Sequence, residues 1–78
     1  MKVLMFTLGN GLEEIENVKY IRIVSKEYNL LIMKDYMPII GSINGSVDIV
    51  TDEFSKKLEN INAYYVNRSN IFRLIIKE

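Results

Sequence analysis

Clustered carboxylates are the residues of this chain whose spacing comes closest to a catalytic pattern. Glu13, Glu14 and Glu16 form one cluster, and Asp52 and Glu53 form another. Cleavage of a glycosidic bond uses two acids that separate elements place across a cleft. Acids that are neighbours in one segment rarely meet this demand, so we interpret both clusters as solvated surface charge.

Other catalytic and metal-binding patterns are missing from the sequence. The 78 residues contain no histidine and no cysteine, so the commonest general base, the thiol nucleophiles and the usual zinc ligands are absent. The segment Gly9 to Gly11 is too short for a phosphate-binding loop and lacks a following lysine. We therefore predict a protein that is not an enzyme, with no catalytic residues, no cofactor and no metal.

The composition is that of one small globular domain, which we take to span residues 1–78. Apolar residues make up 49% of the chain and charged residues 26%. Ten basic and ten acidic residues cancel, so charge gives no reason to expect nucleic acid or an anionic membrane surface as partner. The length is near the lower limit at which one core is stable without disulfides.

No segment of the sequence has the length of a membrane span. The longest apolar runs, Leu30 to Met33 and Met37 to Ile40, are far short of the roughly 20 residues that a span needs. The N-terminal run Val3 to Phe6 is too short for the apolar region of a signal peptide. We expect a cytoplasmic protein with no direct membrane insertion.

Short apolar or β-branched runs, separated by turn-forming residues, predict a series of strands. The runs are Lys2 to Thr7, Val18 to Val24, Leu30 to Met33, Ala63 to Val66 and Ile71 to Lys77. The polar residues Asn67 to Asn70 predict a turn before the last run, and Leu30 to Met33 could be buried on both faces. About seven such strands indicate an all-β fold, a small β-sandwich or flattened barrel.

Asn44-Gly45 is the strongest hairpin signal in the chain, since a type I′ turn needs positive φ at both central residues. Two segments, GLEEIENVKYI and TDEFSKKLENI, instead carry apolar residues at helical spacing, which are Leu12, Ile15 and Tyr20 in the first. In the second, Phe54, Leu58 and Ile61 have helical spacing, and propensity alone allows a two-turn helix over Glu53 to Asn60 as readily as a strand.

From Val18 onward the sequence resembles the N-terminal β-sandwich of the epsilon subunit of rotary F-type ATP synthases. That family's pattern contains FG(I/V)LPGHAPLL followed by LKPG, and VKYIRIVSKEYNLLIMKDYMPIIGSINGSVDIV follows its spacing without a gap. Ile32-Met33 fall on (I/V)L, Pro38 falls on the proline of HAP, and Ile39-Ile40 fall on the apolar pair after it. The segments VLMFT and AYYVNRSNIFRLIIKE resemble the family's first strand and last hairpin, so the likeness covers nearly the whole chain.

The resemblance implies structural details that the pattern alone leaves open. Ser55 to Ile61 would be a strand, while Ile32-Met33 and Ile39-Ile40 would be buried anchors that hold out the loop from Lys34 to Pro38. Leu31 departs from the family's loop glycine, and Lys34-Asp35-Tyr36 depart from its PGH. The family's C-terminal helical hairpin would begin where this sequence ends, so we expect this polypeptide to lack it.

The resemblance also implies a function and partners. In that family the sandwich is a non-catalytic part of the central stalk, which couples the gamma subunit to the membrane c-ring in proton-driven ATP synthesis. By position, Glu27, Tyr28 and Asn29 would face the c-ring, and Thr7 with Tyr36, Met37 and Pro38 would lie toward gamma. The protein would then be peripheral to the inner or plasma membrane as part of the complex.

A second hypothesis from a different class is left open by the residues themselves. A free-standing small β-barrel could act as an adaptor that binds peptide or RNA. Tyrosines beside basic residues could stack on bases, and Tyr20 and Tyr28 have basic neighbours. The adaptor predicts a basic or aromatic face, which the balanced charge does not favour.

Overall fold

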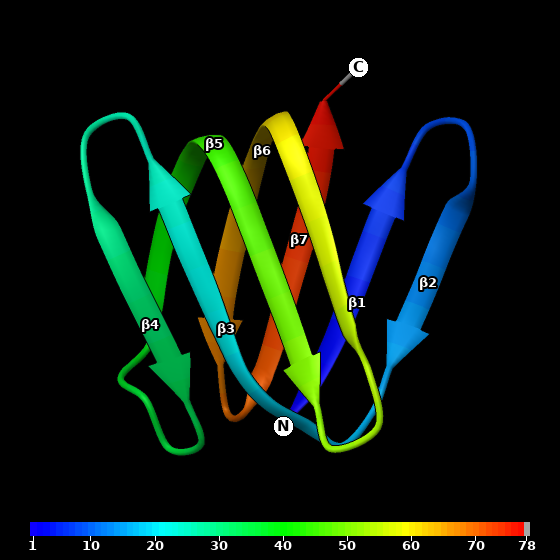
Figure 1. Ribbon diagram of the computed structural model, residues 1–78, viewed down its shortest axis with the longest axis vertical. Coiled ribbons are helices and arrows are strands. Elements are labelled where there is room, and N and C mark those ends of the chain that lie inside the picture. The colour runs from blue at the N-terminus through cyan, green and yellow to red at the C-terminus, as the bar shows by residue number, and fades with distance from the viewer. Residues whose placement is uncertain (78) are drawn as a thin grey trace.

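The computed structural model describes residues 1–77, which form seven strands and no helix (Figure 1). The strands are β1 (Lys2–Thr7), β2 (Gly11–Ile15), β3 (Val18–Ser25), β4 (Asn29–Met33), β5 (Ile39–Thr51), β6 (Ser55–Arg68) and β7 (Ile71–Lys77). The prediction of a small all-β sandwich is confirmed, but not all strands are short and antiparallel: β5 and β6 have 13 and 14 residues, and β1 pairs with β7 in parallel. The described residues also hold no helix of the length and apolar character that a membrane span requires.

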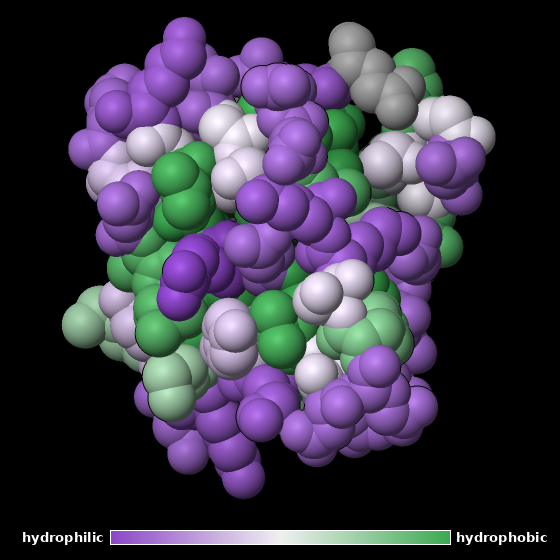
Figure 2. Space-filling model, in the orientation of Figure 1, coloured by the Kyte–Doolittle hydropathy of each residue, from purple (hydrophilic) through white to green (hydrophobic). Residues whose placement is uncertain are grey.

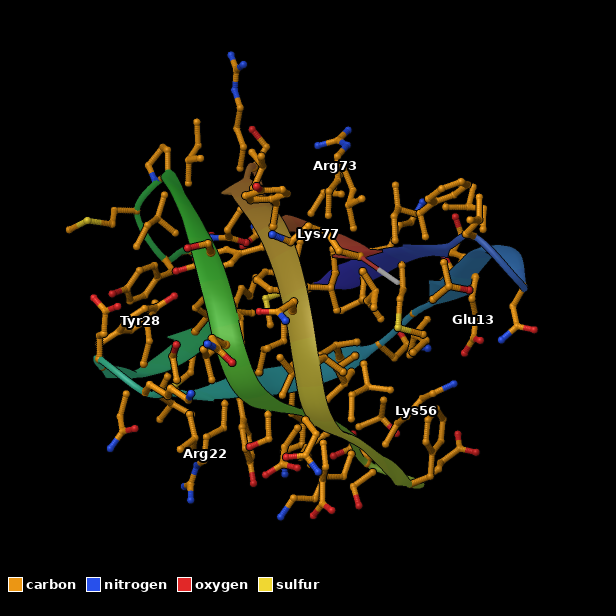
Figure 3. All side chains as sticks on the ribbon, turned by 90° about the horizontal axis from the view of Figure 1, so that it is seen from above. Glu13, Arg22, Tyr28, Lys56, Arg73 and Lys77 are labelled. Carbon is orange, nitrogen blue, oxygen red and sulfur yellow. The ribbon has the colours of Figure 1, made fainter. Side chains whose placement is uncertain are left out.

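The strands form a mixed sheet in the order β2-β1-β7-β6-β5-β3-β4, which folds over on itself into two layers. Neighbours pair antiparallel, apart from β1 and β7, which are parallel. The back layer of Figure 1 contains β2, β1, β7, the second half of β6 and the first half of β5; the front layer contains the other halves of β6 and β5, followed by β3 and β4. Both layers are seen from above in Figure 3.

The fold-over occurs where the two long strands bend together. Gly45 pairs with Ser25 of β3 and with Ile61 of β6, and a Cβ at Gly45 would collide with the carbonyl oxygen of Val24. Opposite it, the register between β5 and β6 shifts by one residue, and Asn60 adopts a φ of 54°. This is a β-bulge with an extra residue in a left-handed conformation, which Asn tolerates, and bulges increase the local bend of a strand.

The core lies between the two layers and is filled by alternate residues of the strands. Fully buried side chains come from both layers, including Phe72 and Leu74 of β7, Ile21 and Ile23 of β3, and Ile32 of β4. The rings of Tyr65 and Phe72 stack with centroids 5.4 Å apart. Each strand therefore gives one set of alternate side chains to the core and the other set to an outer face.

A turn before β7 is confirmed, but it is shorter than the predicted Asn67 to Asn70, because Asn67 and Arg68 belong to β6. Ser69 and Asn70 have φ values of 52° and 61° and connect Arg68 to Ile71, as in a two-residue hairpin of type I′. The hairpin predicted at Asn44-Gly45 is wrong, because both residues are inside β5. Glycine is needed at position 45 because the backbone of β3 passes too close for a Cβ, and not because φ is positive there.

The helix considered for Glu53 to Asn60 is also wrong, and the strand implied by the resemblance is confirmed, since Ser55 to Ile61 belong to β6. The bulge explains the helical spacing. Its extra residue lets Leu58 and Ile61, three positions apart, both pack against the core. A periodicity of three therefore arises here within a strand.

Two predictions of buried residues are only half right, because about half of the side chains expected in the core are exposed. Of the expected anchors, Ile32 is fully buried and Ile39 packs against the core, but Met33 and Ile40 are exposed. Leu30 to Met33 is not buried on both faces either, because it forms the sheet-edge strand β4, whose outer side chains Leu31 and Met33 reach the surface.

Candidate partner-binding surface

The turn between β3 and β4 places Glu27 and Asn29 at the surface and Tyr28 in a structural contact. The Tyr28 hydroxyl donates to the carbonyl oxygen of Ser42 at 2.6 Å and lies 3.1 Å from the Tyr65 hydroxyl. Ser42 is on the stretch of β5 that precedes its pairing with β3, so Tyr28 covers this edge of the back layer. Of the three predicted residues, Glu27 and Asn29 are exposed and accessible to a partner.

Tyr65 supports Tyr28 from the interior. Its side chain is 2% exposed, and its ring lies over Gly41, where a Cβ would overlap the ring. Burial raises the pKa of Tyr65 above its ordinary value, and the hydrogen bond with Tyr28 raises it further. The two hydroxyls therefore form a neutral hydrogen-bonded pair that closes one side of the sandwich, the left side in Figure 3.

Thr7 and the loop from Tyr36 to Pro38 lie at opposite ends of β7. Thr7 pairs with Ile76, whereas Asp35 bonds through its N–H and its carboxylate to the side chain of Asn70, just before β7 begins. Ile76 is six positions along the chain from Asn70, or roughly 20 Å in an extended strand. The structure therefore does not bring these predicted residues together.

The side chains predicted to lie toward gamma also differ in their surroundings. The Thr7 hydroxyl accepts the N–H of Asn10 at 3.1 Å, and Thr7 lines a small hollow with Glu13 and Lys56. Tyr36 is half-buried against the core. Met37 is 66% exposed, so it is the side chain of the loop that is best placed for a partner.

The outer face of the back layer carries an apolar surface that crosses all of its strands. Register places Leu12, Phe6, Ile75 and Tyr64 in one row, and Leu4, Val66 and Ile40 in the next. Five of these side chains are at least 44% exposed, and Ile40 reaches 79%. We name this surface the apolar face; it consists of Leu4, Phe6, Leu12, Ile40, Tyr64, Val66 and Ile75.

The apolar face continues to the loop at Pro38. A hollow of about 370 Å³ is lined by Pro38, Ile39, Ile40, Val66, Asn67 and Arg68. The Asn67 amide, which is buried, donates to the carbonyl oxygen of Met37 at 3.5 Å. Pro38 and Met37 thus border the apolar face at one corner, and Phe6, next to Thr7, lies across the layer from them.

Arg73 interrupts the apolar face. It lies between Leu4 and Val66 in the second row and projects outward from the back layer, as Figure 3 shows. Among residues 1–77 no carboxylate lies within ion-pair distance of Arg73. Lys77 lies over the Tyr64 ring, 4.5 Å from its centroid.

The outer face of the front layer is more polar. Register aligns Leu31, Arg22, Asp48 and Lys57 in one row, with the carboxylate between two cations, an arrangement that stabilises neighbouring strands. Figure 2 shows this face, where hydrophilic side chains cover most of the surface and hydrophobic ones lie scattered between them. Large exposed apolar patches usually mark interaction sites, so the apolar face is the better candidate.

Sequence reasoning missed the apolar face, although the runs that form it carried a signal. A strand with one solvated face alternates apolar and polar residues. Val3 to Phe6 is apolar at every position, and so are Leu74 to Ile76, which surround Ile75. In such a run one set of alternate side chains points into the core, so the other set forms a second apolar surface on the outside of the strand.

The clustered carboxylates are exposed at the surface, as interpreted, and three of them form ion pairs. Glu13 bonds to Lys56 at 2.9 Å, Glu14 to Lys2 at 3.2 Å and Asp52 to Lys19 at 3.4 Å. Glu13 and Glu14 are successive residues of β2 and project to opposite sides of the layer. Within the part of the chain that the structure describes, no three potential metal ligands cluster.

Comparison with known proteins identifies the fold. No family model and no curated protein matches this chain. Among solved structures, it is similar to a chain in the cryo-EM structure of the Tetrahymena thermophila mitochondrial ATP synthase, central stalk and c-ring, with a TM-score of 0.79 and 14% sequence identity. The match covers 100% of this chain and 63% of that chain. The chain thus has the fold of a domain of that assembly and spans less than two thirds of the chain it matches.

Proposed function

We propose that this protein is a non-catalytic rotor subunit of a rotary F-type ATP synthase, equivalent to the sandwich of the epsilon subunit. The observation that carries the proposal is the fold likeness over the entire chain to a component of a central stalk and c-ring structure. The sequence resemblance to the epsilon sandwich supports the same assignment. In this role the protein couples the gamma subunit to the c-ring during proton-driven ATP synthesis, and it is held at the membrane through the complex.

The surfaces of the molecule are compatible with two partners. We place gamma on the apolar face, with Tyr36, Met37 and Pro38 at one corner and Thr7 at the rim beyond Phe6. We place the c-ring at the β3–β4 turn, where Glu27 and Asn29 are exposed and Tyr28 holds the turn against β5. The polar loops of a c-ring suit this polar turn, and an apolar protein surface suits the apolar face.

The test is affinity capture of the tagged protein from detergent-solubilised membranes of the organism that encodes it. We expect gamma and the c subunit in the eluate, identified by mass spectrometry. Ile75→Glu, in the apolar face, should lose gamma, whereas Leu31→Glu on the front layer should retain it; the two side chains have similar exposures of 50% and 43%. Recovery of the protein alone overturns the proposal. Recovery with RNA or with an unrelated peptide also overturns it, and favours the alternative of a free-standing adaptor that binds peptide or RNA.

A further inference from the structure

The position of Arg73 restricts what can cover the apolar face. β7 is the central strand of the back layer, with β1 and β2 on one side and β6 and β5 on the other. Arg73 is therefore central across the strands; along them it lies in the second of the two rows, and the next row holds Lys2, Ile71 and Arg68. Its row neighbours Leu4 and Val66 are apolar. The one carboxylate in this row, Glu14, is two strands away, about 10 Å, and is paired with Lys2 at 3.2 Å.

A partner that covers the apolar face must also cover the guanidinium group of Arg73. Burial of an unpaired charge costs several kcal/mol, and an Arg side chain cannot lose its proton to avoid that cost. Arg at the centre of an apolar surface is typical of residues that dominate binding energy when the partner supplies an acceptor. A carboxylate matches best, because it accepts two parallel N–H bonds from the planar group.

A second copy of this chain does not meet this requirement. In a twofold dimer formed through the middle of the apolar face, the same surface meets itself, so the two central Arg73 side chains would approach each other. Like charges that are desolvated together oppose association. The occupant is therefore a different molecule whose charge complements Arg73.

From these observations we infer that the apolar face binds a protein surface that is apolar around one carboxylate, and that this carboxylate pairs with Arg73. The inference rests on the proposed function for the identity of the partner, which is gamma. It goes beyond the fold likeness by specifying that the partner surface carries a carboxylate opposite Arg73. Apolar contacts with Ile75, Tyr64 and Ile40 supply area, and the ion pair sets the orientation of the partner on the back layer.

The experiment is titration calorimetry of the purified protein with the purified gamma subunit of the same organism, for wild type and four variants. Arg73→Met, which keeps the length of the side chain and removes its charge, should weaken binding by about 30-fold or more, because the partner's carboxylate is left buried and unpaired. Arg73→Lys should bind between wild type and Arg73→Met, and Arg73→Glu more weakly than either. Arg22→Glu, on the opposite outer face, is the control and should bind as wild type does.

Charge reversal identifies the partner's residue. A photoreactive phenylalanine derivative in place of Tyr64 would be cross-linked to gamma, and mass spectrometry would locate the segment that it reaches. Each Asp or Glu of that segment is then changed to Lys and titrated with Arg73→Glu. We expect one of these changes to restore at least part of the lost affinity.

Each outcome separates the inference from the proposed function. If Arg73→Met binds gamma as tightly as wild type while Ile75→Glu does not bind, the ion pair is wrong and the gamma contact stands. If wild type does not bind gamma, the proposed function fails and this inference fails with it. If instead wild type binds phosphatidylglycerol vesicles and Arg73→Met does not, the acceptor is a lipid phosphate and the inference is overturned.

Discussion

The two outer faces of this sandwich are supplied by the same two long strands, yet they differ in character. The first half of β5 gives Ile40 to the back layer, and its second half gives Asp48 to the front layer. β6 gives Lys57 to the front layer and Tyr64 and Val66 to the back layer. Since solvent alone favours polar side chains on both faces, the apolar half of each strand indicates a surface that a partner covers.

The largest effect is expected where the two faces are joined. Gly45→Ala places a methyl group against the backbone of Val24 and Ser25, and backbone atoms cannot give way as a flexible side chain can. We expect a loss of about 3 kcal/mol or more in the free energy of unfolding, measured by urea denaturation. Gly9→Ala, in the exposed β1–β2 loop, is the control, and an equal loss in both variants would contradict this account of Gly45.

The second prediction addresses the difference between the faces directly. Ile75→Glu should weaken the proposed binding to gamma by at least about 30-fold, since it puts a charge between Phe6 and Tyr64 in the centre of a row. Leu31→Glu, beside Arg22 on the front layer, should change binding by less than about 3-fold. Calorimetric titration measures both, and circular dichroism checks that both variants fold. Equal losses would show that the apolar face has no special role.

The third prediction separates stability from binding. Tyr65→Phe removes the hydroxyl that lies 3.1 Å from that of Tyr28 and should cost about 1 kcal/mol of folding free energy at pH 8. The proposed binding of gamma to the apolar face should not change, because Tyr65 is on the inner side of the back layer. A large loss of affinity would show that the two properties are coupled.

Tyr65 also predicts how stability depends on pH. Burial raises its pKa, whereas in the unfolded chain the hydroxyl loses its proton near pH 10. Above about pH 10 the unfolded state thus holds fewer protons, so the free energy of unfolding falls by up to about 1.4 kcal/mol per pH unit. Urea denaturation at pH 8 and pH 11 should show a smaller fall for Tyr65→Phe; identical falls would exclude Tyr65 as the cause.

The smallest effect is expected at the other side of the sandwich, where Lys56 of the front layer meets Glu13 of the back layer at 2.9 Å (Figure 3). Both side chains are partly exposed, and exposed pairs contribute less than about 1 kcal/mol. Lys56→Ala should lower the free energy of unfolding by that amount at low salt and by less at about 0.5 M NaCl, because salt screens the pair. A loss above about 2 kcal/mol would mean that this contact holds the layers together.

Much of the fold could be predicted because most strands are short apolar runs bounded by turn residues. The limits of β1 and β7 agree with the runs Lys2 to Thr7 and Ile71 to Lys77. The bends of β5 and β6 could not be predicted from local pattern, since they depend on contacts between distant segments. Gly45 is required by Val24, and the bulge at Asn60 makes a strand imitate helical spacing.

The candidate surface was predicted less well, for a related reason. Position along the chain does not show that Thr7 and Pro38 are at opposite ends of β7, or that Tyr28 is used to cover the edge of β5. The apolar face depends on which residues of five different strands share one side of the back layer. Only the register of the strands reveals that Ile40, Tyr64 and Phe6 belong to the same surface.

The passage of β5 and β6 through both layers has a mechanical consequence. Force applied to the back layer reaches the front layer through two continuous covalent chains, and not only through contacts between side chains. Sliding the layers past each other would require these strands to unzip from one another, one hydrogen-bonded pair after the next. The molecule should therefore be stiff against twisting between its two outer faces, which is a property that the proposed rotor role requires.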